Sequence, residues 1–243
     1  MAFFDKNNEL MYHIHCKKGD IGEFVILPGD PFRTEKIAAF LDDYELIAHN
    51  REHKTYTGHL DGIKVSVTST GMGGGSTAIC VEELIKCGAK YLIRIGTCGR
   101  ITEEAKDESL DGCIVTAAVR DEGTTLHYIP VEYPAVADRK VVEALAEAAE
   151  KLGYNYMEGM IQTKDSYYGQ VEPENMPTEA NLDYRMQCWE RGNVAVTDME
   201  SATLFIVSQI RRVKAASVMS FKETEKSIAV IMEAIRILHN KGE

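Results

Sequence analysis

Short apolar runs alternate with amphipathic stretches along most of this chain, and this alternation limits the folds that it can adopt. Buried strands are predicted at Phe24–Leu27, Tyr91–Ile95 and Cys113–Val119, where mostly apolar residues follow one another. Amphipathic helices are predicted at about Arg33–Phe40, at about Ser76–Lys86 with Ser76 as N-cap, and from the N-cap Asp138 to about Leu152. The pattern indicates an α/β fold with a largely parallel or mixed sheet covered on both faces.

The remaining elements follow the same theme. Asp61-Gly62 is a two-residue hairpin turn between predicted strands at Thr55–Leu60 and Ile63–Ser69. The last part of the chain predicts strands at Val194–Thr197 and Ala215–Met219, each followed by a helix, the last one reaching about Leu238. We expect a single domain over residues 1–243, because this length fits one α/β core.

The charge balance excludes some classes of partner. With a formal net charge of −11, the chain lacks the basic surface that binds nucleic acid or an anionic membrane. No apolar run approaches the roughly 20 residues of a membrane-spanning helix. Residues 1–8 carry charge and amides where a secretory signal needs a long apolar stretch, so we expect a cytoplasmic protein.

The cysteines and histidines predict no metal site. Six cysteines include no C-x-x-C pair, and most of them lie in apolar or glycine-rich stretches, so free and mostly buried thiols are expected. His13 and His15 are the nearest approach to metal-ligand spacing, and no second pair lies beside them.

Three glycine-containing turns follow predicted strands and could line one crevice: Gly29-Asp30-Pro31, Gly71–Ser76 and Gly96–Gly99. Glycine allows backbone N–H groups to approach an anion at such turns. Arg33 and Arg94 lie beside two of them, and a guanidinium binds two phosphate oxygens at once. Either arginine alone reads more simply as a surface charge, but Arg94 stands in an apolar strand, where an anionic partner explains it better.

Two further segments have competing interpretations. Asp198 and Glu200 flank Met199 at a strand-to-helix junction, where they either cap the helix or accept hydrogen bonds from sugar hydroxyls. The polar stretch Lys164–Glu179, which contains two prolines, is predicted to be a functional loop. A dinucleotide site is disfavoured, because Gly71–Gly75 lacks the required glycine spacing and the next strand ends without a ribose-binding acid.

Five motifs, taken in order, resemble the uridine phosphorylase branch of the nucleoside phosphorylase family. The resemblance runs from about Tyr12 to Met219, and its motifs are Pro28–Arg33, Thr70–Ser76 with Glu82-Glu83-Leu84, Ile93–Gly99, Pro134–Asp138 and Met199–Leu204. It implies a three-layer α/β/α sandwich with a central mixed sheet and a homohexamer built as a trimer of dimers with shared active sites. It also implies phosphorolysis of uridine to uracil and ribose 1-phosphate in pyrimidine salvage, with inorganic phosphate as co-substrate and no cofactor.

The resemblance also assigns roles to individual residues. Phosphate would be held by Gly29, Arg33, Arg94 and Thr97, with Arg51 reaching into the site of a neighbouring subunit. Ribose would contact Met199, Glu200 and, across a dimer interface, His13, with His15 as an alternative. The base would contact Tyr167 and Gln170. Arg94, Glu200 and Gln170 would be the catalytic residues.

Three departures from the family pattern bear on the base and the ribose. Asp198 is shorter than the glutamate that the family often has at this position. Glu172 stands where many relatives have an arginine that contacts the base, so Lys164 is expected to contact the base instead. Ser220-Phe221 runs almost directly into Lys222, where relatives have a long polar loop; either the loop is deleted or the sequence omits it. A purine nucleoside phosphorylase and a nucleoside-binding protein with impaired turnover therefore stay open as alternatives. A hydrolase on the same scaffold is a further rival, but it should lack the phosphate-site arginines, and Arg33, Arg51 and Arg94 are all present.

Overall fold

The computed structural model describes residues 10–242, so residues 1–8, on which the expectation of a cytoplasmic protein partly rests, lie outside it. Its strands are β1 (Phe24–Pro28), β2 (Asp42–Asn50), β3 (His53–Leu60), β4 (Ile63–Thr68), β5 (Tyr91–Thr97), β6 (Gly99–Arg100), β7 (Gly112–Asp121), β8 (Ala135–Val136), β9 (Tyr156–Lys164), β10 (Val194–Asp198) and β11 (Lys214–Ser220). Its α-helices are α1 (Pro31–Ala38), α2 (Gly74–Cys87), α3 (Arg139–Leu152), α4 (Tyr167–Val171), α5 (Glu179–Arg191), α6 (Ser201–Arg211) and α7 (Thr224–Asn240).

Within residues 10–242 the strands form one mixed sheet in the order β2-β3-β4-β1-β5-β11-β7-β9-β10-β6, with β8 paired to β7. Strands β4, β1, β5 and β11 are parallel neighbours, whereas β11 and β7 are antiparallel. Because β6 follows β5 after a single residue and pairs with β10, the sheet curls until its far end returns to β5. This curl brings β10 close to β5 although several strands separate them in the sheet.

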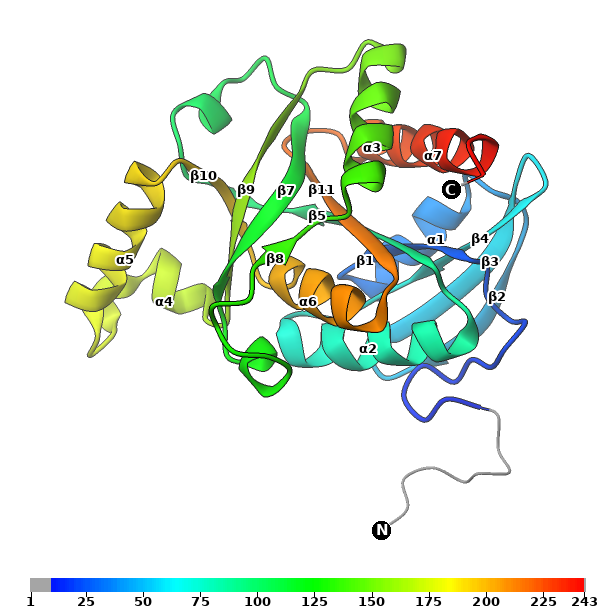
Figure 1. Ribbon diagram of the computed structural model, residues 1–243, viewed down its shortest axis with the longest axis horizontal. Coiled ribbons are helices and arrows are strands. Elements are labelled where there is room, and N and C mark those ends of the chain that lie inside the picture. The colour runs from blue at the N-terminus through cyan, green and yellow to red at the C-terminus, as the bar shows by residue number, and fades with distance from the viewer. Residues whose placement is uncertain (1–9, 243) are drawn as a thin grey trace.

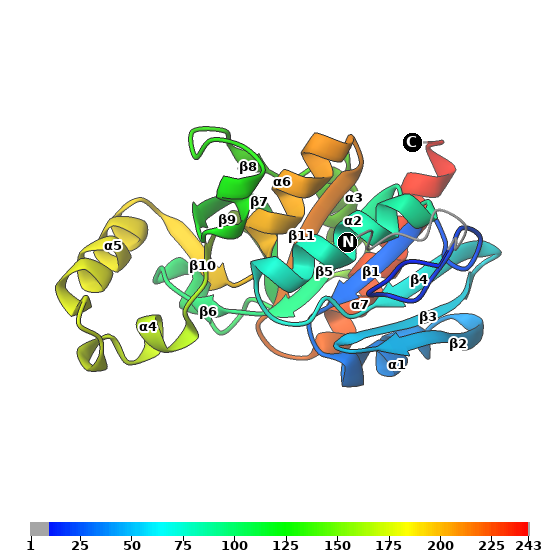
Figure 2. The same ribbon diagram turned by 90° about the horizontal axis from the view of Figure 1, so that it is seen from below.

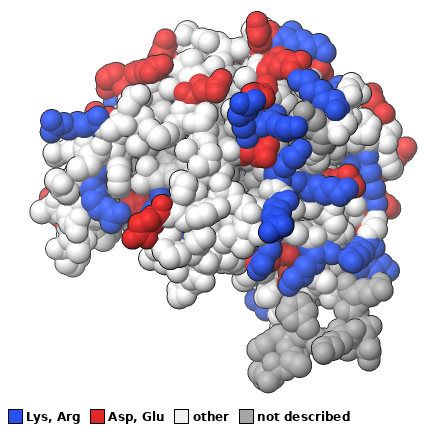
Figure 3. All heavy atoms as spheres, viewed as in Figure 1, with Lys and Arg blue, Asp and Glu red and all other residues white. Residues whose placement is uncertain are grey.

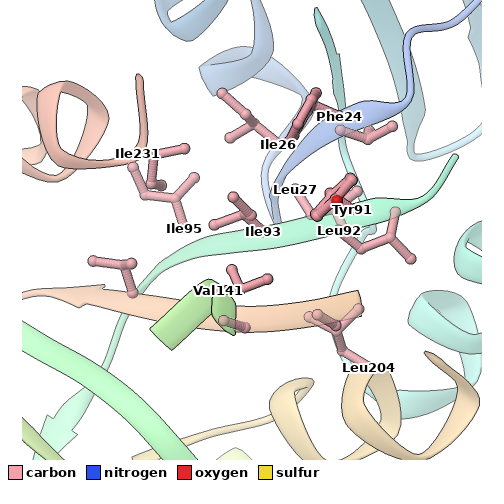
Figure 4. Close-up of a cluster of buried hydrophobic side chains, with 14 of the residues drawn as sticks. Phe24, Ile26, Leu27, Tyr91, Leu92, Ile93, Ile95, Val141, Leu204 and Ile231 are labelled. Carbon is pink, nitrogen blue, oxygen red and sulfur yellow. The ribbon is translucent and has the colours of Figure 1, made fainter. Parts of the chain in front are cut away.

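Helices cover both faces of the sheet, as predicted. Helices α2 and α6 pack together on one face, and α3 packs on α7 on the other (Figures 1 and 2). Buried side chains of both layers belong to one core with the central strands: Figure 4 labels Ile93 of β5, Leu204 of α6, Val141 of α3 and Ile231 of α7 among them. The predicted α/β/α sandwich with a mixed sheet is confirmed.

Most predicted elements are present, with small shifts at their ends. Helix α1 begins at Pro31 because the Asp30 carboxylate accepts a hydrogen bond from the backbone N–H of Phe32, which makes Asp30 the N-cap. The prediction of Ser76 as an N-cap is wrong: α2 begins two residues earlier, and the Ser76 hydroxyl instead donates to the Glu52 carboxylate at 2.8 Å.

Helices α4 and α5 project from one end of the molecule (Figures 1 and 2). The predicted loop Lys164–Glu179 therefore contains α4 and a short 3-10 turn at Pro173–Asn175, and it leads into α5. No residue of α5 is fully buried, and its short apolar stripe, Leu182, Met186 and Trp189, is only partly covered.

Candidate functional site

The three glycine-containing turns lie on one cavity of about 1020 Å³. Gly29, Gly71, Gly96 and Gly99 all line it, together with residues from the end of β10, the two residues before α6 and helices α4 and α5. The prediction that these turns share one crevice is confirmed. A backbone hydrogen bond from Gly71 N to Gly29 O, 3.0 Å long, ties the first turn to the second.

Arg94 is a buried residue that lines this cavity and is paired with two acids of the chain itself. Its Nε donates to Asp198 Oδ2 at 3.0 Å, and its Nη2 donates to Glu200 Oε2. Burial lowers the pKa of Arg94, but the charges of Glu200 and Asp198 outweigh this effect and raise it above its ordinary value. The anionic partner expected for this arginine is thus partly internal, since the curled sheet brings β10 to β5. Among the described residues, its Nη1 has no hydrogen-bond partner.

Arg33 lines the same cavity from the first turn of α1. Its Nη2 is buried and has no hydrogen-bond partner within residues 10–242. Burial lowers the pKa of Arg33, and the positive charge of Arg94 lowers it further. Two guanidinium groups that repel each other and each keep a donor unused form a site suited to a multivalent anion.

Glu200 is held in a fixed orientation. Its Oε1 accepts a hydrogen bond from Gly73 N at 2.7 Å, while Oε2 faces Arg94. Asp198 is bound differently, since its carboxylate accepts from the Ser201 backbone N–H and from the Thr163 hydroxyl as well as from Arg94. The capping interpretation therefore applies to Asp198, and the shorter acid anchors Arg94.

Gln170 and Lys164 occupy another part of the cavity and meet at the hydroxyl of Thr197. Gln170 Oε1 lies 3.2 Å from Thr197 Oγ1, and Lys164 Nζ donates to the same oxygen at 2.8 Å. Burial lowers the pKa of Lys164. The structure thus places Gln170, Lys164, Tyr167, Met199 and Thr97 on the same cavity as the two arginines.

Arg51, His13 and His15 do not line this cavity. Arg51 is exposed in the turn between β2 and β3, with a left-handed φ of 55°. The His13 imidazole Nδ1 lies 2.7 Å from the buried carboxylate of Glu83, whereas His15 is exposed. Of the two histidines, His13 is the one that the fold holds in a defined position.

Several cavity residues were not predicted from the sequence: Glu52, Arg100, Lys106, Met186 and Glu190. Arg100 directly follows the Gly96–Gly99 turn, and that position is the signal that could have identified it. Met186 and Glu190 belong to α5, a mostly polar helix with a short apolar stripe, and nothing in that sequence marks the helix as part of a cavity.

The remaining features concern the cysteines, metal binding and membrane-spanning helices. All six cysteines are free, and four of them are buried, as predicted. Within the described residues no group of three or more His, Cys, Asp or Glu side chains is arranged to hold a metal. None of the helices between residues 10 and 242 is both long and apolar enough to span a membrane.

Comparison with known proteins agrees with the geometry. Residues 23–230 match the family model of the phosphorylase superfamily. The chain is 43% identical to a uridine phosphorylase of Treponema pallidum, over 93% of each chain. It is 35% identical to a uridine phosphorylase of Escherichia coli, over 94% of this chain and 98% of the relative. It is also 35% identical to a guanosine phosphorylase of Halorubrum lacusprofundi, over 85% of this chain and 80% of the relative. With a match over most of its length, this chain belongs to the phosphorylase superfamily.

Proposed function

We propose that this chain is a uridine phosphorylase, a pentosyltransferase that converts uridine and inorganic phosphate to uracil and ribose 1-phosphate. The relatives from Treponema pallidum and Escherichia coli carry that name. The observation that carries the proposal is the pair of unused donors, Arg33 Nη2 and Arg94 Nη1, in a cavity that also holds a fixed carboxylate. A hydrolase would use water and would not need this pair of arginines.

Phosphate is proposed to bind between Arg33 and Arg94, with Gly29 and Thr97 completing its contacts. A Cβ at position 29 would lie 3.4 Å from Gly71 O and 3.9 Å from Arg94 Nη1, so a side chain there would take space beside the guanidinium. Fixing phosphate next to the sugar turns a two-reactant collision into a unimolecular step.

The ribose is proposed to lie against Met199 and Glu200. The Glu200 carboxylate already accepts from Gly73 N and Arg94 Nη2, and its remaining lone pairs can accept from sugar hydroxyls. Arg94 therefore couples the two reactants, because one guanidinium orients the sugar-binding acid and keeps Nη1 for phosphate. The anomeric carbon becomes oxocarbenium-like as the base leaves, and the phosphate anion stabilises that charge.

The base is proposed to pack on Tyr167 and to be read by Gln170, with Lys164 beside it. The Gln170 amide offers both a donor and an acceptor, which matches a carbonyl and the adjacent N–H of uracil. Such groups also stabilise the negative charge of the leaving base. No cofactor and no metal are part of this proposal.

A homo-oligomer with shared sites is proposed as the working form. Arg51 and His13 lie off the cavity of their own chain and would serve a neighbour. Figure 3 shows a broad area with few charges on one face. Between residues 124 and 164, apolar side chains that are more than a third exposed include Leu126, Val131, Tyr133, Val136 and Met160. We propose that further copies of the chain cover these side chains in a homohexamer. We also propose that this hexamer acts in the cytoplasm, in pyrimidine salvage.

Purine phosphorolysis is the second candidate, because the relative from Halorubrum lacusprofundi is named a guanosine phosphorylase. Only three residues, 221–223, separate β11 from α7. The base side of the cavity therefore lacks a long covering loop at this point. Initial rates of base release from uridine, guanosine, inosine and adenosine at saturating phosphate distinguish the two candidates. We expect uridine to have much the highest kcat/KM; a preference for guanosine or another purine nucleoside contradicts the assignment of the base.

A further inference from the structure

Arg100 is a cavity residue to which the proposed function assigns no role. It lies in the two-residue strand β6, which pairs with β10 so that Gly99 is opposite Thr197 and Arg100 is opposite Val196. A Cβ at Gly99 would come within 2.8 Å of Thr197 Cγ2. The turn that carries Arg100 is therefore drawn tightly against the residue that also binds Gln170.

The guanidinium of Arg100 is held on two sides and keeps one donor unused. Its Nη2 donates to Glu108 Oε1 at 3.0 Å, and its central carbon lies over the Phe221 ring, 5.4 Å from the ring centre. Phe221 is fixed in turn, because its N–H donates to Asp111 O at 3.0 Å. Arg100 Nη1 is buried and has no hydrogen-bond partner in the described part of the chain. A planar donor group held in this way is preorganised.

The charge of Arg100 acts inside the cavity. Burial raises the pKa of the cavity thiol Cys98 to about 12, and the charge of Arg100 opposes that rise, as do those of Arg94 and Lys164. Arg100 therefore belongs electrostatically to the cavity and not only to the outer surface, where its partner Glu108 lies.

The edge of uracil has more hydrogen-bonding groups than the single amide of Gln170 can match. This edge presents two carbonyl oxygens on either side of one N–H, and a single amide matches one carbonyl and the N–H. Lys164 Nζ spends one of its three N–H donors on Thr197, and Glu172 offers a carboxylate, which cannot donate when ionised. Arg100 Nη1 is a further cationic donor of this cavity, and among the described residues it is buried without a hydrogen-bond partner.

We infer that Arg100 binds the pyrimidine base, donating from Nη1 to a carbonyl oxygen. This inference rests on the proposed phosphorolysis of uridine. In that reaction a phosphate oxygen forms a bond to the anomeric carbon while the bond from that carbon to the base nitrogen breaks. The electron pair of the broken bond goes to the base, whose carbonyl oxygens carry the resulting negative charge. A guanidinium at one of them stabilises the leaving group.

The test compares Arg100→Gln and Arg100→Lys with Arg139→Gln, which removes an exposed arginine paired to Glu143. For Arg100→Gln we expect kcat/KM for uridine to fall about 100-fold, as for other lost preorganised donors. The loss should be smaller for Arg100→Lys, which keeps the charge, and the KM for phosphate should not change. 5-Fluorouridine should lose much less than uridine, because fluorine itself stabilises the departing anion. Thermal unfolding shows whether each variant is folded.

The outcomes separate the inference from the function on which it rests. No base release from uridine by the unmodified protein contradicts the proposed function. If the unmodified protein is active, a kcat/KM for Arg100→Gln equal to that of Arg139→Gln contradicts the inference alone. Equal losses on uridine and 5-fluorouridine also contradict it, because a purely structural role would affect both substrates alike. If Arg100→Gln does not fold, Arg100→Lys takes its place: the loss of kcat/KM on uridine is compared with the loss on 5-fluorouridine in that variant, and equal losses contradict the inference.

Discussion

At the scale of single residues, the two arginines of the proposed phosphate site differ in their effect on the stability of the folded protein. Arg94 neutralises two buried acids, Asp198 and Glu200, besides offering a donor to the cavity. Burial and the charge of Arg94 both disfavour the charged form of Arg33, and the charge of Asp30 offsets only part of this. We expect both arginines to contribute to activity, but only Arg94 to stabilise the folded protein.

Alanine variants of the two arginines test this difference. We expect either variant to lose about 2–4 kcal/mol of transition-state stabilisation, measured as kcat/KM at varied phosphate. Arg94→Ala should also lower the free energy of unfolding by about 3–5 kcal/mol, because it leaves buried carboxylates without a counter-charge. Arg33→Ala should keep or slightly raise that free energy. Arg139→Ala, on the exposed surface, is the control; kinetics of a folded Arg94→Ala that match this control would refute the assignment.

At the scale of elements, the sequence predicts β1, β5, β7 and β11 and the helices that cover them, because these strands are mostly apolar and the helices are amphipathic. Strands β2 and β9 and helix α5 were missed, since β2 is largely exposed, the first half of β9 is only partly covered and α5 buries no residue. The three glycine turns were predicted to meet, and they do. The internal partners of Arg94 were not predicted, because they lie more than 100 residues away and approach only through the curl of the sheet.

The turn before α2 offers a matched pair of glycine variants. Gly73 and Gly62 have φ values of 85° and 84°, and a Cβ at either meets no atom within 4 Å. Alanine should therefore cost each a similar backbone strain, about 1–2 kcal/mol of stability. Of these two glycines, only Gly73 donates a hydrogen bond to the Glu200 carboxylate. We expect equal drops in unfolding free energy, but a fall in kcat/KM of about tenfold or more for Gly73→Ala alone. Similar kinetics for the two variants would mean that this turn does not orient Glu200.

At the scale of the whole molecule, the buried thiols link stability to alkaline pH. Burial raises the pKa of Cys16 to about 11 and that of Cys87 to about 12. In the unfolded chain thiols titrate near pH 8.5, so above that pH the folded state binds more protons and stability falls as pH rises. The stabilisation is fully present below pH 8.5 and declines by about 1.4 kcal/mol per thiol and pH unit until the folded pKa is reached.

Urea unfolding between pH 7.5 and 10.5 measures this dependence. The double variant Cys16→Ala with Cys87→Ala should lose stability less steeply above pH 8.5 than the unmodified protein. Cys188→Ala, outside the core, serves as control. Parallel pH profiles for the double variant and the unmodified protein would show that these thiols do not carry the effect.

Sharing of sites between subunits is the other property of the whole molecule that can be tested. Arg51→Ala and Arg33→Ala should each be nearly inactive alone, because one would remove a residue that serves a neighbour and the other a residue of the chain's own cavity. Mixed under conditions of subunit exchange, they should recover part of the activity, since some sites then contain both arginines. No recovery, despite exchange demonstrated with labelled subunits, would mean that Arg51 does not act across an interface.

Phosphate dependence of uridine cleavage tests the central claim most directly. The measurement is the release of uracil and the identity of the sugar product, with and without inorganic phosphate, before and after treatment with a metal chelator. Two arginines with unused donors in one cavity predict that release requires phosphate, that the sugar product is ribose 1-phosphate, and that the chelator has no effect. Release of uracil and free ribose at an undiminished rate in phosphate-free buffer would contradict the account.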